Sequence, residues 1–128
     1  MSTNKTQNYA LHAWEASDDF LRQEFNENFA AIDAILKGKA EVVFGTYTGN
    51  KSSQRTIQLG FTPSLLLLMG ERGIGSTYSG GLTALGHPLK NQFKTFLEIV
   101  ENGFQVAYWE DAAHTNSQNS VYHYLAFR

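Results

Sequence analysis

The residues whose side chains are best suited to bind a ligand lie around a tryptophan late in the chain. Trp109 runs directly into a polar loop that extends to residue 120. Aromatic rings can stack on the C–H face of a sugar, while amide and carboxylate side chains bind its hydroxyls. The pattern predicts a non-catalytic glycan site, with Tyr78 added from the other long loop. The candidate residues are Trp109, Phe96, Tyr78, Glu110, Asp111, His114, Asn116 and Asn119. The alternative is that Trp109 is buried beneath a helix or a sister subunit.

Catalysis and cofactor binding find less support in the sequence. Glu110 and Asp111 are adjacent, whereas glycoside hydrolysis needs two carboxyl groups on opposite sides of a sugar. The glycine-rich stretch 70–76 lacks the Lys-Ser/Thr of a phosphate-binding loop, so we interpret it as a surface loop. The histidines at 87, 114 and 123 have no metal-ligand spacing, and the chain has no cysteine. We expect no enzymatic activity, no metal and no cofactor.

We expect these candidate residues to lie on or between β-strands, because apolar and polar residues alternate along the second part of the chain. Strands are predicted at 41–48, 55–61, 64–70, 82–89, 96–101, 104–109 and 121–128, separated by polar turns. Asn102-Gly103 favours a type I′ hairpin that pairs Leu97 with Tyr108 and Ile99 with Val106. Trp109 and Phe96 would then project from the opposite face. About seven short strands predict a mainly β protein, an antiparallel β-sandwich, in which His123 points into the core or a subunit interface.

One amphipathic helix is predicted before the strands, at residues 17–38. Ser17 or Asp18 should cap its first turn, Asp19 and Lys37 should complement its dipole, and Gly38 should take a left-handed turn at its end. Its apolar residues fall on one narrow stripe, which consists of Leu21, Phe25, Phe29, Ile32 and Leu36. The chain thus divides into an arm and helix, 1–38, and a sandwich, 39–128.

The stripe has no second helix in the chain to pack against. It can lie on the chain's own β-sheet, or it can form a short bundle with sister copies. It extends over fewer than three heptads, so it would be marginal as an isolated coiled coil. The aromatic residues of the arm, Tyr9 and Trp14, would fold back on the helix or reach a neighbouring chain.

The composition excludes several classes of protein. The 128 residues carry ten basic and twelve acidic side chains without runs, which argues against a nucleic-acid groove or a polybasic membrane patch. The first eight residues are polar and do not form a signal peptide. The longest apolar run, 65–69, is far below the roughly 20 residues that span a bilayer. We therefore expect a soluble protein without an export signal.

Two sets of motifs resemble known proteins. Residues 8–14 read N-Y-x-L-x-x-W and residues 25–33 read F-N-E-N-F-x-x-I-D. Together they resemble the N-terminal segment of tail and baseplate proteins from phages of Gram-positive bacteria. The second half contains G-x-Y-x-G at 45–49, I-x-L-G-F-x-P at 57–63 and Y-x-Y-x-A-F at 122–127. These are similar to C-terminal domains of phage tail fibres.

The resemblance implies a virion protein, usually a homotrimer, at the distal end of a phage tail or a phage-derived particle. It implies binding to a host cell-surface polysaccharide, with the arm and helix joining the copies and attaching them to other tail proteins. It is equally compatible with a structural cap or adaptor that contacts only tail proteins. Both sets of motifs also have a plain structural explanation. The helix motif forms an amphipathic stripe, and the Gly-Phe-x-Pro motif ends a strand.

Overall fold

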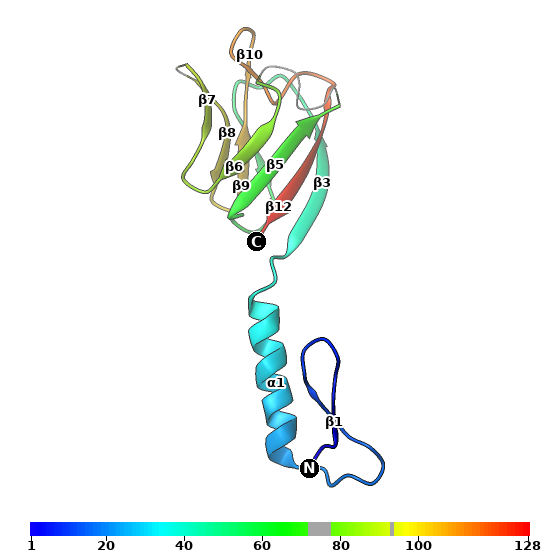
Figure 1. Cartoon of the computed structure of the whole chain (residues 1–128). Coiled ribbons are helices and arrows are strands. Elements are labelled where there is room, and N and C mark those ends of the chain that lie inside the picture. The colour runs from blue at the N-terminus through cyan, green and yellow to red at the C-terminus, as the bar shows by residue number, and fades with distance from the viewer. Residues whose placement is uncertain (72–77, 93) are drawn as a thin grey trace. The chain divides into compact units, whose positions relative to one another are not determined.

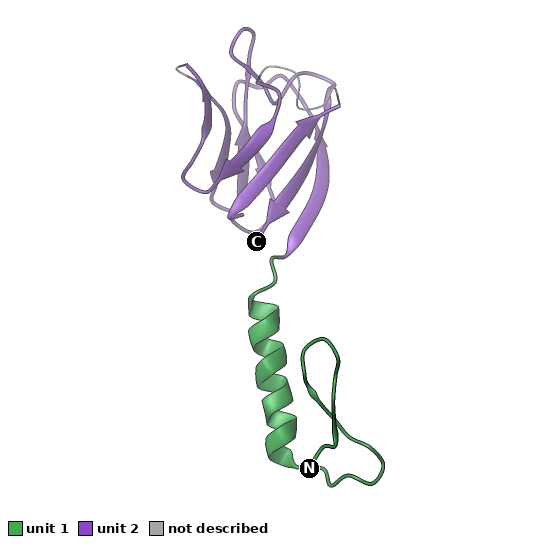
Figure 2. Ribbon diagram, viewed as in Figure 1, with its two compact units in different colours: residues 1–40 green, residues 41–128 purple. Residues whose placement is uncertain are grey.

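The computed structural model describes residues 1–71, 78–92 and 94–128. The chain forms two compact units, Met1–Ala40 and Glu41–Arg128, which Figure 2 colours separately. The division lies two residues from the expected boundary at 38. Within the described residues, no helix is both long enough and apolar enough to cross a membrane.

The first unit consists of a short hairpin and one helix (Figure 1). Strand β1 (Asn4–Lys5) pairs antiparallel with β2 (His12–Ala13), and the helix α1 spans Arg22–Lys37. The arm runs back along the helix because Asn28 of α1 brackets the backbone of His12. The Asn28 Oδ1 atom accepts the His12 N–H at 2.6 Å, and its Nδ2 donates to the His12 carbonyl at 2.9 Å.

The helix begins later than its sequence indicated, and its ends differ from the expectation. Leu21 is the N-cap residue and makes no side-chain cap bond. Asp18 is drawn away from the helix, because its carboxylate accepts the backbone N–H groups of Thr3 and Glu15 at 2.9 and 2.8 Å. Gly38 has a φ of −83°, so the expected left-handed turn was wrong. Its N–H instead donates to the Ile35 carbonyl at 3.1 Å.

The second unit is an antiparallel β-sandwich of two four-stranded sheets in the described part of the chain. We call the first the β12 sheet and the second the β9 sheet, after a central strand of each. In spatial order, the β12 sheet contains β3 (Val42–Thr48), β12 (Val121–Phe127), β5 (Leu65–Gly70) and β6 (Gly81–Ala84). The β9 sheet contains β4 (Arg55–Gln58), β9 (Gly103–Val106), β8 (Lys94–Val100) and β7 (Leu89–Asn91).

The core lies between these two sheets and draws on both. Leu66 and Leu68 of β5 are fully buried, as are Phe104 and Val106 of β9. This confirms the predicted mainly β fold, with an N-terminal helix followed by an antiparallel sandwich. The apolar strand β5 has a neighbour on each side, since it lies between β12 and β6.

The strand predicted at 82–89 is two strands in two different sheets. β6 ends at Ala84 and belongs to the β12 sheet, while β7 begins at Leu89 and belongs to the β9 sheet. Gly86 has a φ of +80°, which reverses the chain between them and is a conformation that glycine adopts without strain. The alternation of apolar residues is therefore interrupted by a corner that joins the sheets.

The hairpin at 102–103 forms with a register two residues away from the predicted one. Leu97 pairs with Val106, Ile99 with Phe104, and Val100 with Gly103. Gly103 is not needed for a left-handed turn. Its Cα faces the backbone of β4, where an added Cβ would lie 2.1 Å from the Ile57 carbonyl oxygen. The close approach of β4, rather than the type of turn, explains why a glycine suits this position.

Candidate functional site

Two of the predicted glycan ligands are buried structural residues, so that part of the prediction was wrong. Asn116 is fully buried. Its Nδ2 donates to Asn50 Oδ1 at 2.7 Å and to the Ser52 carbonyl at 3.0 Å, and its Oδ1 accepts the Asn50 N–H at 3.2 Å. Phe96 is 7% exposed and packs in the core, with its ring 5.6 Å from that of Tyr78.

A buried threonine anchors the loop at its base. The Thr115 hydroxyl accepts the Ala107 N–H at 2.9 Å and donates to the Phe96 carbonyl at 2.5 Å. Its own carbonyl accepts the Tyr47 phenol at 2.5 Å. Burial raises the pKa of the Tyr47 phenol far above its ordinary range, so this phenol remains a hydrogen-bond donor. These buried hydrogen bonds therefore attach the loop at 110–120 to the core of the sandwich.

Trp109 is half-buried and occupies the short strand β10 (Tyr108–Trp109), which pairs with β11 (Ala113–His114). Its ring packs against the core cluster. The Lys94 ammonium lies 3.5 Å from the ring centroid, which places a cation on the aromatic face. Trp109 is thus neither freely exposed nor fully covered, and its ring is occupied by an intramolecular partner.

A hollow of about 340 Å³ is lined in part by the same Lys94, whereas Trp109 itself does not line it. The lining residues come from β7, from the start of β8 and from two loops, and they are Tyr78, Asn91, Gln92, Lys94, Asp111 and Ala112. Of the predicted candidates, only Tyr78 and Asp111 line it. A phenol, two amides, an ammonium and a carboxylate around a small hollow can donate to and accept from hydroxyl groups.

The remaining predicted candidates lie outside this hollow. Glu110 and Asn119 are exposed, and Asn119 sits in a turn where its N–H donates to the Gly49 carbonyl at 3.0 Å. His114 is half-buried and stacks edge-on against Tyr108 at 5.7 Å. Asn91, Gln92 and Lys94 were not predicted, because they belong to β7, to the turn after it and to β8, which sequence spacing alone does not place next to residue 111.

The expectations of no metal site and of a surface loop at 70–76 both stay predictions. Across residues 1–71, 78–92 and 94–128, no group of three His, Cys, Asp or Glu side chains could hold a metal ion. Most of the glycine-rich loop at 70–76 lies outside the described residues, so its interpretation as a surface loop stays a prediction.

The apolar stripe of α1 is only partly covered, since the Phe20 ring, in the segment before the helix, lies 5.2 Å from the Phe25 ring. Leu21, Phe25, Phe29, Ile32 and Leu36 are 40%, 39%, 57%, 38% and 64% exposed. The rest of the arm occupies the neighbouring face, where Glu24 is 7% exposed. The Glu24 carboxylate accepts the Ser2 N–H at 2.8 Å and the Trp14 indole N–H at 3.1 Å. Trp14 therefore folds back on the helix, as one of the two alternatives predicted.

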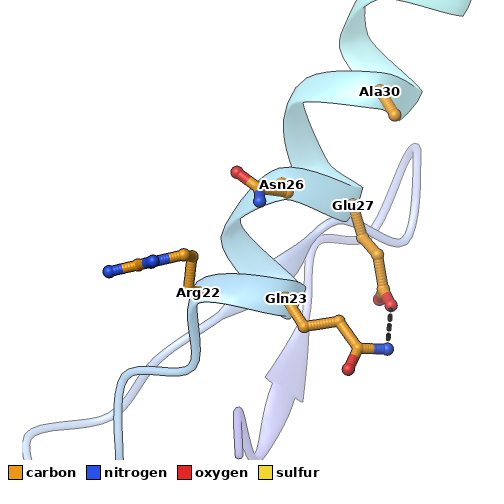
Figure 3. Close-up of a pocket in the computed structure, with 5 residues that line it drawn as sticks. All are labelled: Arg22, Gln23, Asn26, Glu27 and Ala30. Carbon is orange, nitrogen blue, oxygen red and sulfur yellow. Dashed lines mark hydrogen bonds between the residues drawn. The ribbon is translucent and has the colours of Figure 1, made fainter.

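A second hollow, of about 510 Å³, runs along the polar side of α1 (Figure 3). Its lining residues all come from this helix and are Arg22, Gln23, Asn26, Glu27 and Ala30. The Gln23 amide donates to the Glu27 carboxylate at 3.0 Å. This hydrogen bond is the largest cause of a lowered pKa at Glu27, and a hydrogen bond with the His12 ring is the second. A surface formed by a single helix face does not enclose a ligand.

Comparison with protein-family models, with curated proteins and with solved structures finds no match for this chain.

Proposed function

We propose that this chain is a tail or baseplate protein of a phage or a phage-derived particle. In this proposal α1 joins three copies and, with the arm, attaches them to other tail proteins at the tail tip. The sandwich binds a host cell-surface polysaccharide. The number three and the virion setting come from the motif resemblance, whereas the assembly role has a structural argument of its own.

The observation that carries the proposal is the partly exposed apolar stripe of α1. Fully burying one large apolar side chain is worth about 1.5–3 kcal/mol. Phe29 and Leu36 are more than half exposed, although the arm is available to cover the helix. The arm is held on the adjacent face by Glu24 and Asn28, which leaves the stripe partly exposed along the helix. An amphipathic helix with such a stripe gains stability from an apolar partner.

Sedimentation at micromolar concentration tests the assembly. The wild-type chain should sediment as a trimer, and Phe29→Asp should shift it to a monomer, because three charges would be buried together in the bundle. Asn26→Asp is the matched control, since it adds the same charge on the polar side of α1 and should leave the trimer intact. A monomeric wild-type chain, or equal effects of the two variants, would refute the role of the stripe.

The glycan site is proposed at the hollow lined in part by Lys94. Asp111 contributes the carboxylate, Lys94 the ammonium, and Tyr78 the aromatic wall. Binding to an array of bacterial surface polysaccharides should fall at least about tenfold in Asp111→Asn, because a charge-assisted hydrogen bond is lost. Glu101→Gln makes the same change on the exposed turn between β8 and β9 and should bind normally. Unchanged binding by Asp111→Asn would place the site elsewhere.

The second candidate is a structural adaptor that contacts only other tail proteins. It is favoured by the intramolecular cation on Trp109 and by the burial of Asn116, both of which reduce the surface available to a sugar. An Asp111→Asn particle that assembles but fails to adsorb to cells supports the receptor role. A particle that fails to assemble supports the adaptor.

A further inference from the structure

The two sheets of the sandwich differ in their outward faces. On the β9 sheet the outward residues include Thr56, Gln58, Glu98 and Gln105, which are polar. This is the usual pattern for an antiparallel sheet with one face in the core and one in water. The β12 sheet breaks the pattern, because two rows of its outward face are apolar from one edge to the other, and the polar residues of that face, Thr46, Thr48 and His123, lie outside these rows.

Strand register defines this face. Phe44 pairs with Leu125, Leu125 with Leu67, and Leu67 with Leu82, which makes one apolar row across all four strands. The next row runs from Val42 through Phe127 and Leu65 to Ala84. We call these two rows, with Met69 and His123 beside them, the outer apolar face. It contains no lysine, arginine, aspartate or glutamate.

The face is open to solvent among the described residues. Phe44 is 66% exposed, Leu82 57%, Val42 50% and Met69 37%. These four side chains present roughly 400 Å² of apolar surface, as large as the whole of the biggest patch on many monomeric proteins. The half-buried residues of the two rows add to it. An apolar patch of this size marks a site that binds another apolar surface.

We infer that the outer apolar face packs against the same face of other copies of this chain. This inference rests on the proposed assembly through α1. A stable interface between free proteins buries about 800 Å² on each partner, which is more than this face clearly offers. The face would therefore associate weakly by itself, and it needs a second element to hold the copies together.

Assembly through α1 provides this second element, because the connector between α1 and β3 is short. Only residues 38–41 separate the end of α1 from the start of β3, and four residues span at most about 15 Å. Copies joined through α1 therefore keep their sandwiches within a short tether of one another. Short tethers give effective concentrations in the millimolar range, at which a weak apolar contact forms. His123, which lies beside Phe44 at 6.1 Å between ring centroids, would then sit within the interface.

Thiol labelling of the full chain tests the inference, because the natural sequence contains no cysteine. Leu82→Cys places a single thiol on the outer apolar face, and Gln58→Cys places one on the outward face of the other sheet. In the assembled protein, the reaction of Leu82→Cys with a charged maleimide should be at least about tenfold slower, because only the dissociated fraction reacts. Phe44→Cys, at the opposite edge of the same face, should show the same protection.

Sedimentation of the same samples separates the two proposals. Adding Phe29→Asp should yield monomers in which Leu82→Cys reacts as fast as Gln58→Cys. Equal reaction rates in a sample that sediments as a trimer would overturn the inference and leave the role of α1 standing. Slow reaction that persists in monomers would also overturn it, because a segment of the same chain would then cover the face. A wild-type chain that is monomeric would refute both proposals.

Discussion

Replacing Thr115 with valine tests how the loop at 110–120 is held. Valine keeps the shape of threonine but has no hydroxyl, so the Ala107 N–H and the Phe96 carbonyl both lose their partner. Each buried polar group left without a partner costs about 1–3 kcal/mol, so for two groups we expect a loss of about 2–6 kcal/mol in the free energy of unfolding. The Thr115 side chain is fully buried, so solvent does not replace these bonds.

Thr115→Ser is the matched control, because it keeps the hydroxyl and removes only a methyl group. Its expected cost is about 1 kcal/mol, from the apolar area lost. Urea unfolding followed by tryptophan fluorescence measures both variants. A Trp14→Phe background leaves Trp109 as the single reporter and confines the signal to the sandwich. If the serine variant were as unstable as the valine variant, or more so, packing rather than hydrogen bonding would hold the loop.

Two further predictions concern the strand contact at Gly103 and the arm. Gly103→Ala should cost at least about 3 kcal/mol, because the new methyl meets the Ile57 backbone oxygen, whereas Gly60→Ala, with open space around it, should cost about 1 kcal/mol. Hydrogen bonds from the Thr3 side chain and then from backbone N–H groups hold the pKa of Asp18 below its ordinary 3.8. Its stabilising effect is therefore present above pH 3.8 and lost as the pH falls through the lowered pKa.

Urea unfolding of the glycine variants and a comparison of Asp18→Asn with wild type check these two expectations. Protease cleavage of the arm should increase in acid for the wild-type chain but should change less with pH in Asp18→Asn. Equal stability of the two glycine variants, or identical acid dependence of the two arms, would contradict the reasoning.

Much of the fold follows from local sequence pattern. The stripe from Leu21 to Leu36 predicts α1, and alternation predicts most strands, because both depend on neighbours within a few residues. The failures involve distant partners. Asp18 suits a helix cap by its type, but Thr3 and Glu15 hold it in the arm. The hairpin turns at residues 101–102, and Gly103 lies in β9 against the backbone of β4, more than forty residues earlier.

The candidate site was less predictable for the same reason. Asn116 has the side chain of a sugar ligand, yet Asn50 and Ser52, more than sixty residues away, use both atoms of its amide group. Lys94 was overlooked because its contact with Trp109 joins β8 to β10, and no spacing along the chain indicates it. Loop residues reveal their chemical type in a sequence, but their exposure depends on the folded neighbours.

The position of β12 has a consequence for synthesis. This strand lies between β3 and β5 and pairs with both, yet a ribosome makes it after every other strand of the sandwich. Until residues 121–127 emerge, β3 and β5 expose unpaired backbone edges and part of the leucine-rich surface. Non-local pairing of this kind is slow and leaves such edges open to association. The nascent chain therefore passes through its most aggregation-prone state just before translation of the sandwich is complete.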